Sequence, residues 1–475
     1  MALNFSQNKQ LNCLKFTKYY NARKITILVK LGDNLMTSKA SLVSQNPQEF
    51  IALLQKNNIK RFSLVYDKNT DKVKVSDSRL QALADFINAD KRDFMQHEGM
   101  LFQLSEKHDV LFGAFIHKTN RGQASGGLRY WHYATMEDFL RDGMRLSKGM
   151  TRKNALANLW WGGGKGIMVH NPKNDKNDKK MREELYKDYG RFITSIKGCY
   201  ITAEDVGTCE EDMGNIFTQT RFTTCIPASV GGSGNPSSAT ALGVVHGMEA
   251  ALKFLDMGTL AGKTVAVQGM GHVAEPMMGY MFERNVAKII VVDINQDLIV
   301  KVKAKYADKN LDARLVDIKD NSILFQECDI LAPCATGAIL NDESIPQIKA
   351  KIICGASNNQ LKDSKIHGQA IADKGITYVP DFLVNRMGIV NCADEQSGYI
   401  DNDPYFYRHL DQDFEHSVFQ TALQVLKQSK SSGIPPADVA IQLADELAQE
   451  NNPIYGHRGE KIIASLLVNN WHESL

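Results

Sequence analysis

Short apolar runs alternate with amphipathic stretches between residues 264 and 391, and this alternation predicts strands joined by helices. Repetition of strand, helix and strand favours a parallel sheet with right-handed crossovers. The C-terminal half is therefore expected to contain an α/β domain. The predicted strands are Thr264–Gln268, Ile289–Val292, Asp329–Ala332, Lys351–Cys354, Ile376–Val379 and Ile389–Asn391.

An upstream region, residues 94–221, mixes the same two periodicities and predicts a second α/β unit. Val110–Ile116 is expected to be a strand. Thr135–Met150 is expected to be a helix, because its apolar residues recur at helical spacing and its first turn holds two acidic residues that suit the helix dipole. Outside this region, we expect a helix start at Asn46, a strand at 62–66 and helices after residue 403, with one helix boundary at Pro435-Pro436.

Composition and charge narrow the classes of partner. The 475 residues carry 56 basic and 54 acidic side chains, so the formal net charge is only +2. This balance gives no global field of the kind that nucleic-acid binders or anionic-membrane binders carry, so no nucleic acid and no membrane is expected as a partner. No apolar run approaches the roughly 20 residues that a membrane-spanning helix needs. Glycine outnumbers proline by 35 to 12, which suggests that glycines shape specific turns.

The cysteines and the N-terminus bear on the compartment. The eight cysteines form no Cys-x-x-Cys pair, and no histidine lies at zinc-finger spacing from two of them, so no metal site is expected. Free thiols in a reducing compartment are the natural interpretation. Residues 1–32 hold six basic and no acidic residues, which is typical of a mitochondrial transit segment and also of a basic tail. We therefore expect a cytoplasmic protein, or a mitochondrial-matrix protein if residues 1–32 are a leader.

A glycine-rich turn follows the strand predicted at residues 264–268. Gly269-Met-Gly-His-Val-Ala274 is the Gly-x-Gly-x-x-Ala form of the dinucleotide fingerprint. In that fingerprint Gly269 permits the tight turn, Gly271 lets backbone approach a pyrophosphate, and Ala274 keeps helix and strand close. Asp293 ends the next strand, where a carboxylate binds ribose hydroxyls and repels a 2′-phosphate, so NAD is the predicted cofactor. A Rossmann-like fold that binds another nucleotide, or none, is the alternative.

Two lysines stand twelve residues apart, at Lys153 and Lys165. Gly162-Gly-Gly-Lys165 resembles a phosphate loop, but Leu159 and Gly166 occupy positions where a Walker motif needs Gly and Ser or Thr. Neighbouring ammonium groups lower one another's pKa and burial lowers one further, so one lysine can be a general base while the other binds a carboxylate. The glycines would then leave room for a small substrate. Taken alone, the segment fits two solvated lysines at a turn equally well.

Two adjacent acids, Glu204 and Asp205, follow another predicted strand and precede Val-Gly-Thr208. Acids in such a place either cap a helix or supply a carboxylate for proton transfer. On this segment alone, the helix cap is favoured.

Together these segments resemble the Glu/Leu/Phe/Val amino-acid dehydrogenases, and the leucine-type members most closely. The resemblance spans about residues 98–456, with its motifs in family order. The matching motifs are Gly126-Gly-Leu-Arg129, Met150-Thr-Arg-Lys-Asn-Ala155, Gly162-Gly-Gly-Lys165, Thr202-Ala-Glu-Asp-Val-Gly-Thr208, Ser233-Gly-Asn-Pro-Ser237, Val265-Ala-Val-Gln-Gly-Met-Gly271, Val292-Asp-Ile-Asn295, Ala332-Pro-Cys334, Gly337, Asn341-Asp-Glu343, Ile345-Pro-Gln347, Asn358-Asn-Gln-Leu361, Pro380-Asp381 and Ala393-Asp-Glu395.

The resemblance implies an α/β fold of two domains with a cleft between them: a Rossmann NAD domain and an α/β substrate and dimerisation domain. The implied division is an N-terminal extension at 1–85, a substrate-binding, catalytic and oligomerisation domain at 86–228, the NAD-binding domain at 229–400, and C-terminal helices at 401–475 that partly return to the first domain. It also implies a homo-oligomer.

The implied activity is the reversible, NAD-dependent oxidative deamination of an L-amino acid to a 2-oxo acid, ammonia and NADH. By position, Lys165 would be the general base that activates water, Asp205 would handle proton transfer at the amino nitrogen, and Lys153 would bind the α-carboxylate. No metal is required. The implied substrate contacts are Ser125, Gly126, Gly127, Ile389 and Cys392, and the implied cofactor contacts are Gly269, Gly271, Ala274, Asp293, Asn358 and Thr240.

The substrate pocket departs from the leucine-type pattern. Ser125 replaces an apolar residue (a lysine in glutamate-type enzymes), Cys392 replaces valine, and Arg386-Met387 replace small residues. Without lysine at 125, glutamate is disfavoured, and a leucine-like, valine-like or other apolar substrate is expected. One interpretation of Arg386 is that it points to solvent while Met387 fills the gap. The altered pocket and the N-terminal extension also motivate an alternative, a non-catalytic dinucleotide-binding protein with an enzyme-like body.

Overall fold

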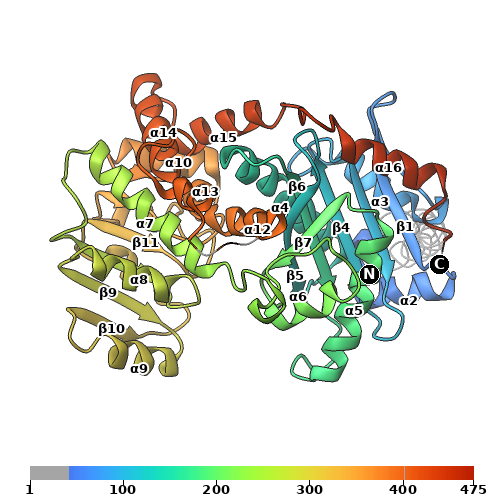
Figure 1. The fold of residues 1–475 in the computed structure, drawn as a ribbon, viewed down its shortest axis with the longest axis horizontal. Helices are drawn as coiled ribbons and strands as arrows, with labels where there is room; N and C mark the ends of the chain where they lie inside the picture. Colours follow the sequence, from blue (N-terminus) through green and yellow to red (C-terminus); the bar gives the residue numbers. More distant parts are fainter. Residues whose placement is uncertain (1–41, 399, 401, 475) are drawn as a thin grey trace, which may run out of the picture.

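Two β-sheets organise the chain, as the computed structural model in Figure 1 shows. The structure describes residues 42–398, 400 and 402–474. The leader predicted at residues 1–32 lies outside the described residues. Each sheet carries helices on its faces, and α12 (Met387–Ser397) lies between the two sheets in Figure 1. Within the described residues, no helix is long and apolar enough to cross a membrane.

The first sheet is mixed, with strand order β2-β1-β3-β4-β6-β5-β7. β5 pairs in parallel with β6 and β7, whereas β1 to β4 and the β4–β6 pair are antiparallel. Both β1 and β2 belong to this sheet, although the sequence prediction placed them in an N-terminal extension; the predicted domain boundaries remain predictions. The strands are β1 (Arg61–Asp67), β2 (Lys72–Val75), β3 (Gly99–Leu104), β4 (Leu111–Lys118), β5 (Ala124–Trp131), β6 (Gly162–Val169) and β7 (Tyr200–Glu204).

The second sheet is entirely parallel, with strand order β10-β9-β8-β11-β12-β13. The strand order reverses between β8 and β11, and such a switch point is where doubly wound folds bind ligands. The predicted parallel α/β sheet is thus confirmed. The strands are β8 (Thr264–Gln268), β9 (Lys288–Asp293), β10 (Leu311–Leu315), β11 (Ile330–Pro333), β12 (Ile352–Ile353) and β13 (Thr377–Tyr378).

One predicted strand is wrong: Ile389–Asn391 lies inside helix α12. A short apolar run fits a buried helix turn as well as a buried strand, and the surrounding polar residues of α12 extend the run to helical length. The other helices are α2 (Pro47–Lys56), α3 (Gln81–Ala89), α4 (Met136–Leu156), α5 (Lys179–Ser195), α6 (Glu210–Phe217), α7 (Ser237–Phe254), α8 (Ala274–Glu283), α9 (Gln296–Lys305), α10 (Ser364–Asp373), α11 (Asp381–Val384), α13 (Pro404–Tyr407), α14 (Val418–Ser432), α15 (Pro436–Leu447) and α16 (Arg458–Val468).

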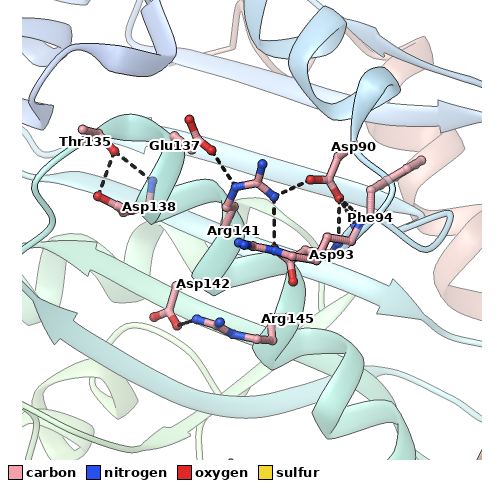
Figure 2. Close-up of polar contacts among 10 residues, drawn as sticks. Asp90, Asp93, Phe94, Thr135, Glu137, Asp138, Arg141, Asp142 and Arg145 are labelled. Carbon is pink, nitrogen blue, oxygen red and sulfur yellow. Dashed lines mark hydrogen bonds and ion pairs between the residues drawn. The ribbon is translucent and has the colours of Figure 1, made fainter. Parts of the chain in front are cut away.

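Helix α4 is anchored at its start by the polar contacts drawn in Figure 2. The Thr135 hydroxyl accepts a hydrogen bond from the backbone N–H of Asp138 and caps the helix, whose first turn holds the two acidic residues expected from the sequence. Arg141 pairs with Asp90 and, at 3.2 Å, with Asp93. These ion pairs tie α4 to the turn that follows α3, so the long helix has a fixed direction toward the second sheet.

The C-terminal helices connect the two halves. Helix α14 packs with α7 in the core of the second half, whereas α16 places Ile463 and Leu466 in the core of the first. In Figure 1, α16 lies beside β1, at the opposite end of the molecule from β10. Between them, Arg152 of α4 forms a bidentate ion pair with Asp445 of α15, at 2.8 and 2.9 Å. The last part of the chain therefore crosses from one half to the other.

Candidate active site

A cavity of about 700 Å³ opens between the two halves. It collects residues from the first sheet, from the second half and from α12, which are far apart in the sequence. The predicted site residues that line it are Gly127, Lys153, Lys165, Asp205, Thr240, Asn358, Ile389 and Cys392. The predicted residues that lie outside its lining are Ser125, Gly126, Gly269, Gly271, Ala274 and Asp293.

Lys165 is buried in the middle of β6, with 4% of its surface exposed, and its ammonium group forms an ion pair with Asp205. Burial lowers the pKa of Lys165 well below its usual value; the charges of Arg129 and Lys153 lower it further, and that of Asp142 opposes the shift. A lysine with a depressed pKa can be neutral near physiological pH and accept a proton. Asp205 is the ion-pair partner of Lys165, and the segment-based interpretation of Asp205 as a helix cap is wrong, because α6 begins later, at Glu210.

Lys153 lies in the last turn of α4 and faces the same cavity. Within the described residues its ammonium group has no hydrogen-bond or ion-pair partner. Burial lowers the pKa of Lys153 to about 8, and the carboxylate of Asp381 opposes this shift. A half-buried cation without a partner among the described residues is costly, so the site favours an anionic ligand that supplies the opposite charge.

The glycines near these lysines have different uses. A side chain on Gly127 would approach the Cβ atom of Asp205 to 2.6 Å, so glycine here keeps the strand close to the carboxylate. We expected Gly162–Gly164 to leave room for a substrate, but they do not line the cavity. Instead, a side chain at Gly163 would overlap α4 at Thr151, and one at Gly164 would meet the Tyr200 ring at 2.5 Å. These glycines let α4 and the neighbouring strands pack against β6.

The dinucleotide fingerprint has the predicted strand–turn–helix geometry between β8 and α8. Gly269 adopts a left-handed backbone conformation (φ +86°), and a side chain there would approach the Ala335 Cβ atom to 2.8 Å. A side chain on Gly271 would meet nothing within 4 Å, so the backbone at this position is open to a ligand. Asp293 accepts a hydrogen bond from the backbone N–H of Met270 at 2.7 Å, which places its carboxylate at the turn. These residues fit a dinucleotide.

Two polar residues approach the cavity from the second half. The Thr240 hydroxyl donates to the Pro236 carbonyl at 2.9 Å near the start of α7. The Asn358 side-chain oxygen accepts a hydrogen bond at 2.8 Å from the Asn385 amide, which also donates to the Ala356 carbonyl at 3.0 Å. Asn385 therefore fixes the orientation of Asn358, and the sequence prediction missed this supporting residue.

Helix α12 forms an apolar wall of the cavity with Ile389 and Cys392. The Cys392 sulfur lies 3.4 Å from that of Cys225, and both thiols are buried. Ser125 is also buried, and its hydroxyl accepts a hydrogen bond from the Asn154 amide at 3.0 Å. The hydroxyl of Ser125 is thus engaged within the protein, which leaves the substrate side of the cavity less polar than the sequence suggested.

Further residues of the site were not assigned from the sequence. Arg129 lines the cavity and donates to Asp142 of α4 at 2.9 Å, and Asp142 also pairs with Arg145 (Figure 2). Glu204 lines the cavity as well; its side chain accepts from Asn235 at 2.8 Å, and burial raises its pKa to about 7. Arg129 ends the Gly126-Gly-Leu-Arg129 motif, so the sequence could have placed it near the site. Its ion pair with Asp142, 13 residues away, could not be predicted from that motif.

Arg386 does not point to solvent, contrary to one interpretation of the sequence. The side chain is fully buried and does not line the cavity. Its guanidinium donates to the Leu156 carbonyl at 2.7 Å and to the Thr421 hydroxyl at 3.0 Å. Met387, the next residue, is buried in the core of the second half.

Comparisons with known proteins place this site in a family. Residues 106–222 match the family model described as Glu/Leu/Phe/Val dehydrogenase, dimerisation domain, and residues 231–451 match that of Glutamate/Leucine/Phenylalanine/Valine dehydrogenase. The chain is 41% identical over 351 residues to leucine dehydrogenase of Geobacillus stearothermophilus, which covers 74% of this chain and 90% of the relative. This chain belongs to the Glu/Leu/Phe/Val dehydrogenase family. It is an amino-acid oxidoreductase that acts on CH–NH₂ donors.

Two further relatives of this Glu/Leu/Phe/Val dehydrogenase differ in their named substrates. Valine dehydrogenase of Streptomyces coelicolor is 34% identical over 347 residues, which are 71% of this chain and 88% of the relative. The crystal structure of L-tryptophan dehydrogenase from Nostoc punctiforme superimposes with a TM-score of 0.59 at 32% identity, covering 74% of this chain and 96% of that one. The predicted two-domain fold is confirmed by this similarity and by the two sheets. The matched dimerisation domain supports a homo-oligomer.

Proposed function

We propose that this Glu/Leu/Phe/Val dehydrogenase catalyses the reversible, NAD-dependent oxidative deamination of an apolar L-amino acid to a 2-oxo acid and ammonia. One observation carries the proposal: the Lys153 ammonium, which no described residue pairs with, and the Lys165–Asp205 pair face one cavity, between the dinucleotide turn and an apolar wall. The carboxylate, the amino group and the apolar side chain of the substrate then each have a complementary group in the protein.

The substrate carboxylate pairs with Lys153, since no described residue forms a hydrogen bond or ion pair with this ammonium and burial lowers its pKa to about 8. The aliphatic side chain packs against Ile389 and Cys392 of α12. Ser125 adds no polar contact there, because its hydroxyl accepts a hydrogen bond from Asn154 and does not line the cavity. Arg129 is engaged as well, since it donates to Asp142. An apolar amino acid therefore fits the cavity better than an acidic one.

Proton transfers follow from the Lys165–Asp205 pair. The substrate amine must be neutral before hydride can leave its Cα atom, and Asp205 accepts that proton. The bound dinucleotide supplies the redox chemistry, accepting the hydride. Neutral Lys165 then removes a proton from the water that attacks the substrate imine, which is the task of a base with a pKa near the working pH.

The preference for NAD is supported by Asp293 at the end of β9. Its carboxylate lies at the fingerprint turn through a hydrogen bond from the Met270 backbone. A 2′-phosphate brought to this carboxylate would place like charges together and cost binding free energy, whereas ribose hydroxyls would donate to it.

The test is a panel of L-amino acids, incubated with the purified protein at alkaline pH and either NAD or NADP, with NADH or NADPH formation followed by absorbance. We expect oxidation of aliphatic or aromatic substrates, little of glutamate, and at least about a tenfold preference for NAD. The Asp293→Ser variant should lose most of that preference. Protein that binds NADH but oxidises no amino acid would contradict the proposal and support the non-catalytic alternative.

A further inference from the structure

Arg386 is a buried cation that pairs with no carboxylate among the residues that the structure describes. It directly precedes α12 and none of its surface is exposed. Burial alone accounts for the lowering of its pKa, since no neighbouring charge offsets it. Keeping such a group in the interior is costly unless hydrogen bonds replace the lost water. The hydrogen bonds that the guanidinium makes must therefore account for its place in the interior.

The guanidinium joins three segments through its two terminal nitrogens. Nη1 donates to the carbonyl of Leu156, the last residue of α4, at 2.7 Å. Nη2 donates to the Thr421 hydroxyl of α14 at 3.0 Å and to the His416 carbonyl just before that helix. The C-terminal end of a helix carries partial negative charge, so the end of α4 is a suitable partner for a cation.

The helices that Arg386 joins carry opposite ends of the proposed substrate site. Lys153, which faces the substrate carboxylate, lies in the last turn of α4. Ile389 and Cys392, which form the apolar wall, lie in α12, within six residues of Arg386. The guanidinium itself does not line the cavity, so it acts on the substrate only through these helices.

We propose that Arg386 is a positioning residue that sets the spacing between Lys153 and the apolar wall of α12, and thereby the length of side chain that the enzyme prefers. This inference rests on the proposed function, because it needs a substrate held by its carboxylate at one helix and by its side chain at the other. If the spacing between α4 and α12 were less fixed, the enzyme would discriminate less between side chains of different length, while the reacting groups would stay the same.

The test uses the straight-chain series 2-aminobutyrate, norvaline and norleucine as substrates for the full-length enzyme and Arg386→Met. Methionine fills similar volume but has no donor. We expect KM for the preferred member to rise about tenfold, and the ratio of kcat/KM between neighbouring members to change at least about threefold. The Kd for NADH should stay within about twofold, because the fingerprint turn is untouched. Arg386→Lys keeps the charge but only part of the donor geometry. Its KM and its kcat/KM ratios should therefore lie between those of the unmodified enzyme and those of Arg386→Met.

Arg408→Met is the control, since Arg408 is exposed and its guanidinium lies over the rings of Tyr405 and Phe414; the length profile of this variant should equal that of the unmodified enzyme. A folded Arg386→Met enzyme with an unchanged length profile would overturn the inference. If Arg386→Met does not fold, an unchanged profile in Arg386→Lys overturns it instead. An unmodified enzyme that oxidises no amino acid refutes the proposed function itself, a result distinct from an unchanged profile in an active enzyme.

Discussion

The dinucleotide side of the cleft is shaped by backbone, whereas the substrate side is shaped by buried charged side chains. On the first side, a left-handed Gly269 and an open Gly271 form one continuous turn after β8. On the second, Lys153 comes from a helix, Lys165 from a strand and Asp205 from the loop after β7, and they meet only in the folded chain. The comparison teaches that binding on the dinucleotide side depends on the shape of the backbone, whereas binding on the substrate side depends on buried charges. Mutations and pH should therefore affect the two sides differently.

The largest effect is expected at the base on the substrate side. Lys165→Ala removes the group proposed to activate water, and general bases contribute about 10²- to 10⁴-fold to a rate. We expect kcat to fall by that factor while NADH binding, followed by fluorescence titration, is retained. Loss of NADH binding in a folded variant would contradict the separation of the two sides.

A pH effect should distinguish the substrate side from the dinucleotide side. Because burial lowers the pKa of Lys153 to about 8, its charge is present below that pH and is lost above it. A carboxylate that does not itself titrate in this range, such as 4-methylpentanoate, should inhibit with a constant Ki below pH 8. Its binding should then weaken about tenfold for each pH unit above 8. Competition assays on the unmodified enzyme would measure this.

Lys153→Gln is the control for that measurement. It should bind 4-methylpentanoate more weakly and show no such dependence on pH, since the amide does not titrate. The same weakening above pH 8 in Lys153→Gln would assign the titration to another group.

Alanine substitutions at the two fingerprint glycines should differ in their effects on stability and on NADH binding. In Gly269→Ala the side chain meets Ala335 in a backbone conformation that favours glycine, so the free energy of unfolding should fall by about 1–3 kcal/mol. Gly271→Ala has free space around its added methyl group, so its stability should change by less than about 0.5 kcal/mol. Its Kd for NADH should nevertheless rise about tenfold, because the methyl group occupies the path of the pyrophosphate. Denaturant unfolding and NADH titration would show both; equal stability losses would refute the distinction.

The smallest effect on activity is expected at Ser125. Its hydroxyl accepts from Asn154 and does not line the cavity. Ser125→Ala should therefore lower the free energy of unfolding by about 1 kcal/mol, the usual value of one hydrogen bond, and leave the substrate profile within about threefold. A tenfold change in preference between apolar and polar amino acids would instead place the hydroxyl on the substrate.

The sequence predicted best what is encoded in contiguous residues. The fingerprint and its flanking strands form a local pattern with a fixed geometry, and the acidic first turn of α4 was equally visible. The prediction failed where a short segment fits two structures: Ile389–Asn391 has the apolar pattern of a strand but lies in α12. Asp205 fitted a helix cap until the fold placed Lys165 beside it.

Other features depend on contacts that no local pattern contains. The glycines of β6 accommodate α4 and Tyr200 rather than a substrate, because the strand is buried on both faces. Arg386 seemed suited to solvent from its charge alone, yet its partners at 156 and 421 lie 230 and 35 residues away. The family resemblance supplied the roles that spacing left open, and the geometry supplied the supporting residues Asn385 and Asp142.

The central claim is that both sides of the cleft act on one substrate, and product stoichiometry tests it most directly. The unmodified enzyme, incubated with NAD and its preferred L-amino acid, should release NADH, ammonia and 2-oxo acid in equal amounts. Lys165→Ala should form none at a comparable rate while still binding NADH. NADH formation without ammonia, or equal rates in the two proteins, would contradict the account.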